Sequence, residues 1–500
     1  MHATNHQLPL IANALKYRDQ NAIIEGDKTF TYDMLLYQSG RVAGGLLQGR
    51  KDLAEKRIAF LLEPGFGYVV TQWGVWRAGG IAVPLCTAHP LPSIEYVLKD
   101  SQVSTMVVDA KYYSFLAPLA DKMAIPLMLV TDLIKGLEVP LPTIALSRRA
   151  LILYTSGTTN LPKGVVSTHA CLSSQIETLV KAWEWQADDH IVNVLPLHHV
   201  HGIVNVVSCA LWAGACCQFV PKFDAETLWS LFEAGDINLF MAVPTIYFKL
   251  ITYWEQASEE RKASLSTALR SFRLMVSGSA ALPVPVLEKW RQISGHTLLE
   301  RYGMTEIGMA LSNPYRGERR PGHVGQALPG VSIRLVDEEG QEVPPGTVGE
   351  IQVKGPNLFE AYWNKPEATA ASFKDGWFCT GDMAQLNDGY YKILGRNSVD
   401  IIKSGGYKIS ALEIEDVLRQ HPLVKDCGVV GIADEEWGEV VAASLVTGGA
   451  AIDLDELSEW LRTQLPAYKV PRRFIIQQDL PRNTIGKVTK KELKQYFIPS

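Results

Sequence analysis

A loop rich in hydroxyl groups and glycine, ending in a lysine, is the stretch of this chain best suited to chemistry. It runs from residue 154 to 164 after an apolar run, and its polar donors are Thr155, Ser156, Gly157, Thr158, Thr159 and Lys163. Backbone N–H groups freed by glycine, hydroxyl groups and an ammonium together favour a polyphosphate. The loop is not a Walker A motif, because Pro162 stands where that motif needs its second glycine. The alternative is an ordinary polar surface turn.

Four further motifs follow along the chain. Residues 277–280 (Ser-Gly-Ser-Ala) close an apolar run, and residues 301–306 (Arg-Tyr-Gly-Met-Thr-Glu) bring a ring, a hydroxyl and a carboxylate close together. Asp382 and Arg396 suit ribose hydroxyls, and Lys487 lies on a turn near the C-terminus. Each motif alone is weak, since a single Asp or Lys is more often a solvated surface charge. Together and in this order they predict a nucleotide site.

Length and composition indicate a globular enzyme of more than one domain. The chain has 500 residues, more than one hydrophobic core usually supports. Its net charge of -5 disfavours nucleic acid as a partner, because phosphate backbones select clustered lysine and arginine. The seven cysteines show no C-x-x-C spacing, which indicates buried thiols in a reducing compartment.

Neither targeting nor membrane insertion is expected. The first 20 residues have no basic region ahead of an apolar one, so we expect no signal or transit peptide and a cytoplasmic location. Residues 191–221 contain no Asp, Glu, Lys or Arg, but their histidines and asparagines would be costly in lipid. We therefore expect a buried core passage there and no membrane span.

The elements that must position these motifs alternate between strands and helices. Apolar β-branched runs at 57–62, 105–108 and 239–243 are each followed by an amphipathic stretch, at 65–78, 112–123 and 245–256. This alternation predicts the α/β class, with parallel sheets covered by helices. From Val331 onwards, short strands separated by Gly and Pro predict a β-rich subdomain.

A separate unit is expected after Arg396. We predict helices at 410–420 and 453–464 and strands at 427–432 and 440–447, which form a small α+β domain. The chain is therefore divided into an N-terminal nucleotide-binding domain, residues 1–396, and a C-terminal domain, residues 397–500.

In type and order, these motifs resemble those of the adenylate-forming superfamily of acyl-CoA synthetases, adenylation domains and luciferases. The resemblance covers roughly residues 22–500. The chain is most similar to the malonyl-CoA synthetase branch, on the runs 301–306, 398–403 (Ser-Val-Asp-Ile-Ile-Lys) and 499–500 (Pro-Ser). The resemblance implies ATP, Mg²⁺ and coenzyme A as cofactors, and a large N-terminal domain with a mobile C-terminal lid joined near Arg396.

The resemblance also assigns a role to each motif residue. Phosphate binding would fall to Thr155, Ser156, Gly157, Thr158, Thr159 and Lys163, and the adenine site to Ser279, Ala280, Tyr302, Gly303 and Met304. The reaction centre would comprise Thr305 on the α-phosphate, Glu306 on Mg²⁺, Asp382 and Arg396 on the ribose, and Lys487 on the carboxylate and α-phosphate. Gly405 and Gly406 would line the pantetheine tunnel. The segment from Arg396 to Lys403 is one residue longer than usual, which leaves the hinge open among Ser398, Val399 and Asp400.

The implied reaction has two steps with conflicting needs. A substrate carboxylate first attacks the α-phosphorus of ATP, anion against anion, so positioning and charge neutralisation by Mg²⁺ and Lys487 are what catalysis needs. A thiol then attacks the acyl-adenylate, and its pantetheine arm needs the space that Lys487 held. A rotating lid would satisfy both steps.

Arg301 indicates which acid is activated. In this superfamily the residue before Tyr-Gly-Met-Thr-Glu faces the acyl pocket, and an unpaired buried arginine there would cost about 3–5 kcal/mol. A second carboxylate on the substrate removes that cost, with His201 as the expected second contact. The structural alternative is an ion pair between Arg301 and an internal acid such as Glu300. His198 and His199 are either packed core histidines or an access gate.

Several alternatives remain open from the sequence. Methylmalonate differs from malonate by one methyl group, which Met304 and Met309 could accommodate. A general short- or medium-chain acyl-CoA synthetase conflicts with Arg301, and an amino-acid-activating domain conflicts with the lack of a carboxylate in residues 198–205. An inactive nucleotide sensor would be expected to lack Glu306 or Lys487. Either a monomer or a homodimer is consistent with the sequence.

Overall fold

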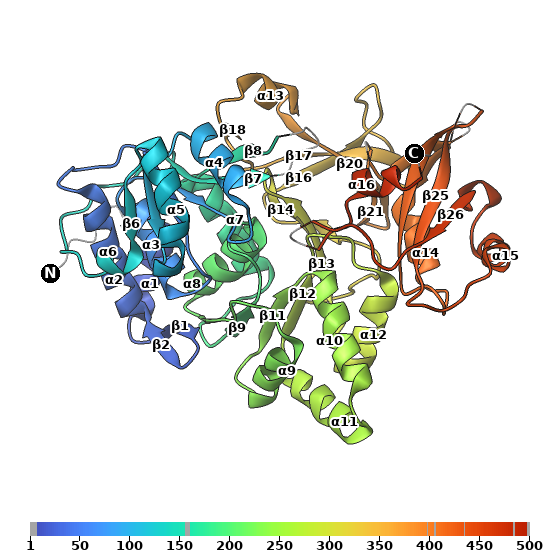
Figure 1. Ribbon diagram of the computed structural model, residues 1–500, viewed down its shortest axis with the longest axis horizontal. Coiled ribbons are helices and arrows are strands. Elements are labelled where there is room, and N and C mark those ends of the chain that lie inside the picture. Colours follow the sequence, from blue (N-terminus) through green and yellow to red (C-terminus); the bar gives the residue numbers. More distant parts are fainter. Residues whose placement is uncertain are drawn as a thin grey trace.

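The computed structural model describes residues 8–155, 161–397, 399–404, 407–434, 436–483 and 486–497. Figure 1 shows the N-terminal residues, in blue to green, forming one broad α/β body, with the orange and red C-terminal strands at its side. The expected α/β fold with a smaller C-terminal domain is confirmed.

The first large sheet has nine strands in the order β15-β14-β13-β12-β11-β9-β10-β1-β2. Neighbours from β1 through β10, β9, β11 and β12 to β13 are parallel, whereas β2, β14 and β15 pair antiparallel at the two edges. The strands are β1 (Asn21–Glu25), β2 (Lys28–Thr31), β9 (His190–Asn193), β10 (Cys216–Phe219), β11 (Leu239–Ala242), β12 (Leu274–Ser277), β13 (Leu299–Met304), β14 (Gly308–Ser312) and β15 (Gln326–Ala327). The parallel core is the arrangement expected from alternating strands and helices.

The second large sheet has seven strands in the order β18-β8-β7-β4-β3-β5-β6. Its centre is parallel, and β8 and β18 pair antiparallel at one edge. The strands are β3 (Arg57–Leu61), β4 (Ile81–Pro84), β5 (Thr105–Val108), β6 (Leu127–Leu129), β7 (Arg149–Thr155), β8 (Lys163–Thr168) and β18 (Ala361–Tyr362). The division into two separate sheets could not be read from strand spacing alone.

Helices cover these sheets and share one core with them. Helix α3 (Phe66–Arg77) is apolar on nearly all sides, and it packs in a single hydrophobic cluster with residues of both sheets. A Cβ on Gly74 would lie 2.5 Å from Val42 of α2 (Tyr32–Leu47), so this glycine permits close packing of the two helices. The other principal helices of this body are α4 (Leu91–Asp100), α5 (Ala110–Met123), α7 (His169–Ala182), α9 (Ala225–Ala234), α10 (Pro244–Gln256), α11 (Glu259–Ala268) and α12 (Val284–Ser294).

A five-stranded antiparallel sheet forms the β-rich subdomain expected from residue 331 onwards. Its strands are β16 (Ser332–Val336), β17 (Val348–Lys354), β19 (Phe373–Lys374), β20 (Trp377–Asn387) and β21 (Tyr390–Arg396). The pairing of β20 with β21 sets Asp382 directly opposite Arg396 in the ladder.

The residues after Arg396 form a further sheet with its own hydrophobic core. It comprises β22 (Ile401–Ser404), β23 (Tyr407–Ser410), β24 (Asp426–Asp434), β25 (Gly438–Val446) and β26 (Arg473–Ile476), with helices α14 (Ala411–Leu418), α15 (Leu454–Gln464) and α16 (Lys490–Gln495). The boundary at residues 396/397 lies between β21 and β22, and its use as a domain division stays a prediction.

Residues 191–221, the uncharged passage, fold as β9, a π-helix (η2, His201–Ser208), α8 (Cys209–Ala213) and β10. Most of this passage is buried, as expected for core, and the π-helix is buried throughout. Within the part of the chain that the structure describes, no helix has the length and apolarity that a membrane crossing would need.

Candidate active site

The loop predicted to bind an anion joins the antiparallel strands β7 and β8. The ladder pairs Thr155 with Lys163 at its mouth, and the hydroxyl of Tyr96 donates to the Pro162 carbonyl at 2.7 Å. The Lys163 ammonium lies 5.0 Å from the ring centre of Tyr362, a cation–π distance. Ser156, Gly157, Thr158 and Thr159 lie outside the described residues.

The turn after β13 carries the acid expected to hold a metal. Glu306 is buried, and its Oε1 accepts a hydrogen bond from the Tyr362 hydroxyl at 2.9 Å. Burial raises the pKa of Glu306, while the bond from Tyr362 and the charges of Arg396 and Lys163 oppose that rise. Tyr362 therefore lies between the metal-site candidate Glu306 and the phosphate-loop lysine Lys163. Thr305, the expected α-phosphate contact, is half-buried on the same turn.

Asp382 connects the expected adenine and ribose residues. Its Oδ2 accepts from the Tyr302 hydroxyl at 2.7 Å, and its Oδ1 lies 3.1 Å from Nε of Arg396. Burial, with the nearby Asp382 charge adding to it, raises the pKa of Tyr302 well above its ordinary value, so this hydroxyl stays protonated. The three side chains come from β13, β20 and β21, elements that are distant in sequence.

Arg301 and His201 meet at Ser279. The Ser279 Oγ lies 3.1 Å from Nδ1 of His201, and the Arg301 Nη2 donates to it at 3.5 Å. Ser279 itself has a left-handed backbone with φ of 69°, an uncommon conformation for serine. Ala280 follows it on the same loop after β12. A Cβ on Gly278 would lie 2.4 Å from the Arg301 guanidinium carbon, so glycine is needed where that group passes.

The guanidinium of Arg301 is buried without an acid. Only 3 % of the residue is exposed, and within the described ranges Arg301 has no ion pair and its Nε has no hydrogen-bond partner. Burial lowers the pKa of Arg301 to about 9. The neighbouring acid Glu300 instead accepts a backbone N–H from Leu282 at 3.3 Å, and burial raises its pKa to about 8. The structural alternative, an Arg301–Glu300 pair, is therefore wrong.

His198 and His199, which precede His201 in the chain, lie close to each other and to His89. The rings of His198 and His199 lie 4.1 Å apart and those of His198 and His89 lie 6.1 Å apart. Burial lowers the pKa of His198 to about 2 and that of His199 to about 4, so both are uncharged near neutral pH. His201 begins the π-helix η2, and burial and the charge of Arg301 lower its pKa well below the ordinary value.

Lys487 lies on a tight turn of the C-terminal region. Its backbone N–H donates to Oδ1 of Asn483 at 2.9 Å, and Arg482 donates to the Gly486 carbonyl at 2.8 Å. A Cβ on Gly486 would lie 3.3 Å from the Thr245 hydroxyl at the start of α10, so this turn lies against the large domain. The Lys487 side chain is exposed. Gly405 and Gly406, expected in the thiol tunnel, lie outside the described residues, as does Ser398.

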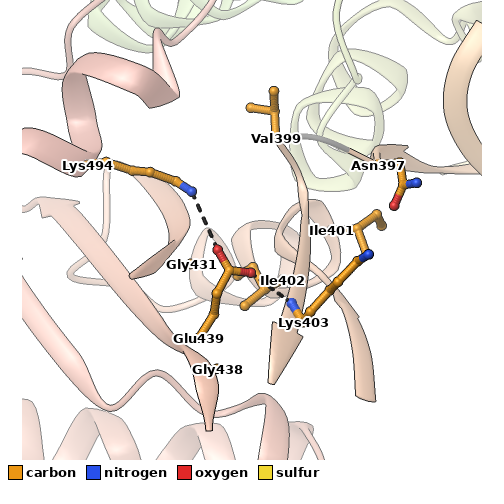
Figure 2. A pocket seen from close by; sticks show the side chains of 9 residues that line it. All are labelled: Asn397, Val399, Ile401, Ile402, Lys403, Gly431, Gly438, Glu439 and Lys494. Atoms are coloured by element: carbon orange, nitrogen blue, oxygen red, sulfur yellow. Dashed lines mark hydrogen bonds and ion pairs between the residues drawn. The ribbon is translucent and has the colours of Figure 1, made fainter. Parts of the chain in front are cut away.

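The cavity in Figure 2, of about 400 Å³, lies beside the segment predicted to hold the hinge and not among these residues. Asn397 and Val399 line it together with strands β22 and β25 of the C-terminal domain. No cluster of three or more potential metal ligands occurs among the residues that the structure describes.

Sequence reasoning missed two features of the site. Tyr362 was not singled out, although it contacts both Glu306 and Lys163. The Ser279 hydroxyl was assigned only to the adenine site, whereas it bonds His201 and lies beside Arg301. Neither contact has a sequence signal, because the partners are separated by at least 22 residues.

The chain belongs to the AMP-binding enzyme family. The family's model matches residues 10–363, and the model of the AMP-binding enzyme C-terminal domain matches residues 413–487. This confirms the adenylate-forming class indicated by the motifs.

Relatives and solved structures with this fold extend over nearly the whole chain. It is 44 % identical to the human protein named malonate–CoA ligase ACSF3, mitochondrial, over 99 % of this chain and 93 % of that one. It is 40 % identical to a malonate–CoA ligase of Arabidopsis thaliana, over 95 % and 86 % of the two chains. The crystal structure of ATP-bound MatB from Rhodopseudomonas palustris matches with a TM-score of 0.90 and 35 % identity, over 98 % of this chain and 99 % of that one.

Proposed function

We propose that this chain is an ATP-dependent malonate–CoA ligase, which forms malonyl-CoA, AMP and pyrophosphate from malonate, ATP and CoA through a malonyl-adenylate. The observation that carries the proposal is the buried guanidinium of Arg301, which has no acidic partner among the described residues. Similarity to proteins named malonate–CoA ligases, over 99 % of this chain, supports the same substrate.

A dicarboxylate is the substrate class that satisfies Arg301. An unpaired buried charge costs about 3–5 kcal/mol when its partner is removed, and a substrate carboxylate would supply that partner. Ser279 and the neutral His201 would add hydrogen bonds to the same carboxylate, since Ser279 contacts the guanidinium and His201 contacts Ser279. The substrate's other carboxylate is then left to react with ATP.

The residues of the site fit a bound nucleotide with its metal. Tyr302 offers a ring to adenine, while Asp382 and Arg396 offer an acceptor and donors to the ribose. Thr155 and Lys163 stand at the mouth of the phosphate loop, and Thr305 would contact the α-phosphate. Mg²⁺, which would bind Glu306, supplies charge neutralisation at the phosphates.

Lys487 would neutralise charge where the carboxylate and the α-phosphate converge in the first step. Its turn lies against α10 of the large domain, an orientation suited to that step. For the second step the lid would rotate, so that Gly405 and Gly406 replace Lys487 beside the thiol. Malonate is proposed before methylmalonate because the relatives above are named for malonate.

The test is the release of AMP with ATP, CoA and each of five acids: malonate, methylmalonate, succinate, acetate and octanoate. Malonate should exceed acetate and octanoate by about 100-fold in kcat/KM, the discrimination expected when a charged pair is left unmade. Higher activity with acetate or octanoate than with malonate would overturn the proposal in favour of a general acyl-CoA synthetase.

Two further properties stay predictions. The cytoplasmic location rests on the N-terminal composition, and the vertebrate relatives carry the word mitochondrial in their names. A fractionation experiment decides between these compartments, and sedimentation decides between monomer and homodimer.

A further inference from the structure

A buried lysine of the last helix lies between two carboxylates of the lid. The Nζ of Lys490, the first residue of α16, is 2.8 Å from Oδ1 of Asp400 and 2.8 Å from Oε1 of Glu415. The three side chains are 7 %, 12 % and 6 % exposed, so water screens these pairs little. Burial would lower the pKa of Lys490, but the two carboxylates raise it, which keeps the lysine charged.

Each carboxylate also holds a backbone N–H. The Glu415 Oε1 accepts from Val429 of β24 at 2.8 Å, which ties the pair to the lid's sheet. The Asp400 Oδ2 accepts from the backbone of Arg396 at 3.0 Å, and the Asp400 N–H donates to the Arg396 carbonyl at 2.7 Å. Asp400 therefore bridges the hinge: it contacts the lid on one side and the end of β21 on the other.

Arg396 carries this connection into the nucleotide site. Its side chain pairs with Asp382, which accepts from Tyr302. A continuous path of polar contacts therefore runs from Lys490 through Asp400 and Arg396 to Asp382. A Cβ on Gly395 would lie 2.3 Å from the Asp400 Cβ, so the chain is packed tightly at this point.

Lys490 is also three residues from Lys487 in the chain. The turn that carries Lys487 leads directly into α16, and both lysines contribute to lowering the pKa of Asp400 against the effect of burial. Anchoring Lys490 therefore restricts the position of Lys487 as well as that of Arg396.

We propose that Lys490 is a positioning residue for adenylation: by holding Asp400, its ammonium sets Arg396 and Lys487 around the bound nucleotide. It touches neither substrate nor nucleotide. The proposal rests on the adenylate-forming activity proposed above.

The first test compares Lys490→Met with Lys494→Met. Lys494 lies on the same helix, and its pair with Glu439 is longer, 3.6 Å, and more exposed. Figure 2 shows this pair beside the cavity. Lys490→Met should raise the KM for ATP and slow malonate-dependent pyrophosphate exchange, each by about tenfold, the loss of one well-placed contact. CoA transfer from supplied malonyl-adenylate should persist, and Lys494→Met should change neither step. Equal losses in both steps for Lys490→Met would overturn the proposal.

A second variant separates positioning from folding. Lys490→Met removes the cation from between two buried carboxylates and leaves Glu415 with the more distant Arg419, 3.8 Å away, which lowers stability. The double variant Lys490→Met with Glu415→Gln removes one of these charges, so its melting temperature should recover while pyrophosphate exchange stays slow. Recovery of exchange together with the melting temperature would mean that Lys490 acts only through stability. Lys490→Arg should retain part of the exchange rate, because it keeps the charge.

A third measurement does not depend on which carboxylic acid is the substrate. ATP affinity measured by calorimetry without any acid should fall about tenfold in Lys490→Met and stay unchanged in Lys494→Met. If wild-type enzyme shows no malonate-dependent exchange, the proposed substrate fails and this calorimetric comparison still decides the role of Lys490. Unchanged ATP affinity in Lys490→Met would overturn the positioning role of Lys490.

Discussion

At the scale of single residues, substrate choice depends on Arg301. Arg301→Ala should lower kcat/KM for malonate by about 100-fold, because the distal carboxylate loses its partner. ATP affinity should persist, since Arg301 lies outside the Tyr302–Asp382–Arg396 group. AMP release and calorimetry measure the two effects.

Glu300→Gln is the matched control for this experiment. Glu300 neighbours Arg301 in the chain but bonds the Leu282 backbone, and its pKa of about 8 leaves it largely uncharged at neutral pH. Malonate turnover should therefore be unchanged. If ATP affinity in Arg301→Ala falls as much as malonate turnover, Arg301 is structural and the specificity argument fails.

The raised pKa of Glu306 predicts that adenylation, the first step, depends on pH. Its raised pKa means that the carboxylate takes up a proton at a higher pH than an exposed glutamate does, and the ionised form is the one that binds Mg²⁺. Adenylation should thus fall as pH decreases, and more Mg²⁺ should move the midpoint to lower pH. Pyrophosphate exchange at two Mg²⁺ concentrations measures this, and a midpoint independent of Mg²⁺ would contradict it.

The same shift predicts an effect on stability. A carboxyl group whose pKa is higher in the folded than in the unfolded protein stabilises the fold below its unfolded pKa. This stabilisation is lost as the pH rises through the folded pKa. At neutral pH without metal, Glu306→Gln should therefore raise the melting temperature while it weakens exchange. A lower melting temperature would mean that the carboxylate's bond with Tyr362 outweighs its burial.

The sequence predicted the residues of the candidate site but not their mutual contacts. Motif order and the family resemblance assign Arg301, His201, Asp382 and Arg396 to one site, and the structure shows two groups of contacts among them, one at Ser279 and one at Asp382. Long-range partners such as Tyr362 could not be predicted, because hydrogen bonds between distant segments follow from the packing of whole elements.

At the scale of elements, the Lys487 turn should serve only one half-reaction. Lys487→Ala should cripple pyrophosphate exchange and leave CoA transfer from supplied malonyl-adenylate nearly intact, because the ammonium is needed only where carboxylate and α-phosphate converge. Lys494→Ala, on the helix that follows, is the control. Equal damage to both steps would contradict the assignment.

Local pattern was sufficient for most strands and helices. The strand expected at 105–108 is β5 without change, and the helix expected at 245–256 is α10, which begins one residue earlier at Pro244. A short apolar, β-branched run and a proline at a helix start are local signals. Sheet order and the π-helix at His201 depend on tertiary packing and could not be predicted.

At the scale of the whole molecule, a tether between lid and body should separate the two reaction steps. A Cβ on Gly486 would lie 3.8 Å from the Cβ of Thr245, within the disulfide range of about 3.5–4.5 Å. In the double variant Thr245→Cys with Gly486→Cys, oxidation should form a disulfide between these two positions. The oxidised enzyme should retain pyrophosphate exchange and lose CoA transfer. Reduction should restore the transfer.

The reduced double variant is the control for strain, since the left-handed φ of 80° at position 486 disfavours any side chain. If the oxidised enzyme transfers the acyl group to CoA as fast as the reduced one, the lid need not rotate.

The central claim is that Arg301 recognises the charge of a second carboxylate. The most direct test compares malonate with its monomethyl ester, which keeps one reactive carboxylate and a similar size but loses the distal charge. We predict that kcat/KM for the half ester is lower by about 100-fold in the wild type, and that Arg301→Ala removes most of this difference. Equal kcat/KM values for the two acids in the wild type would contradict the account.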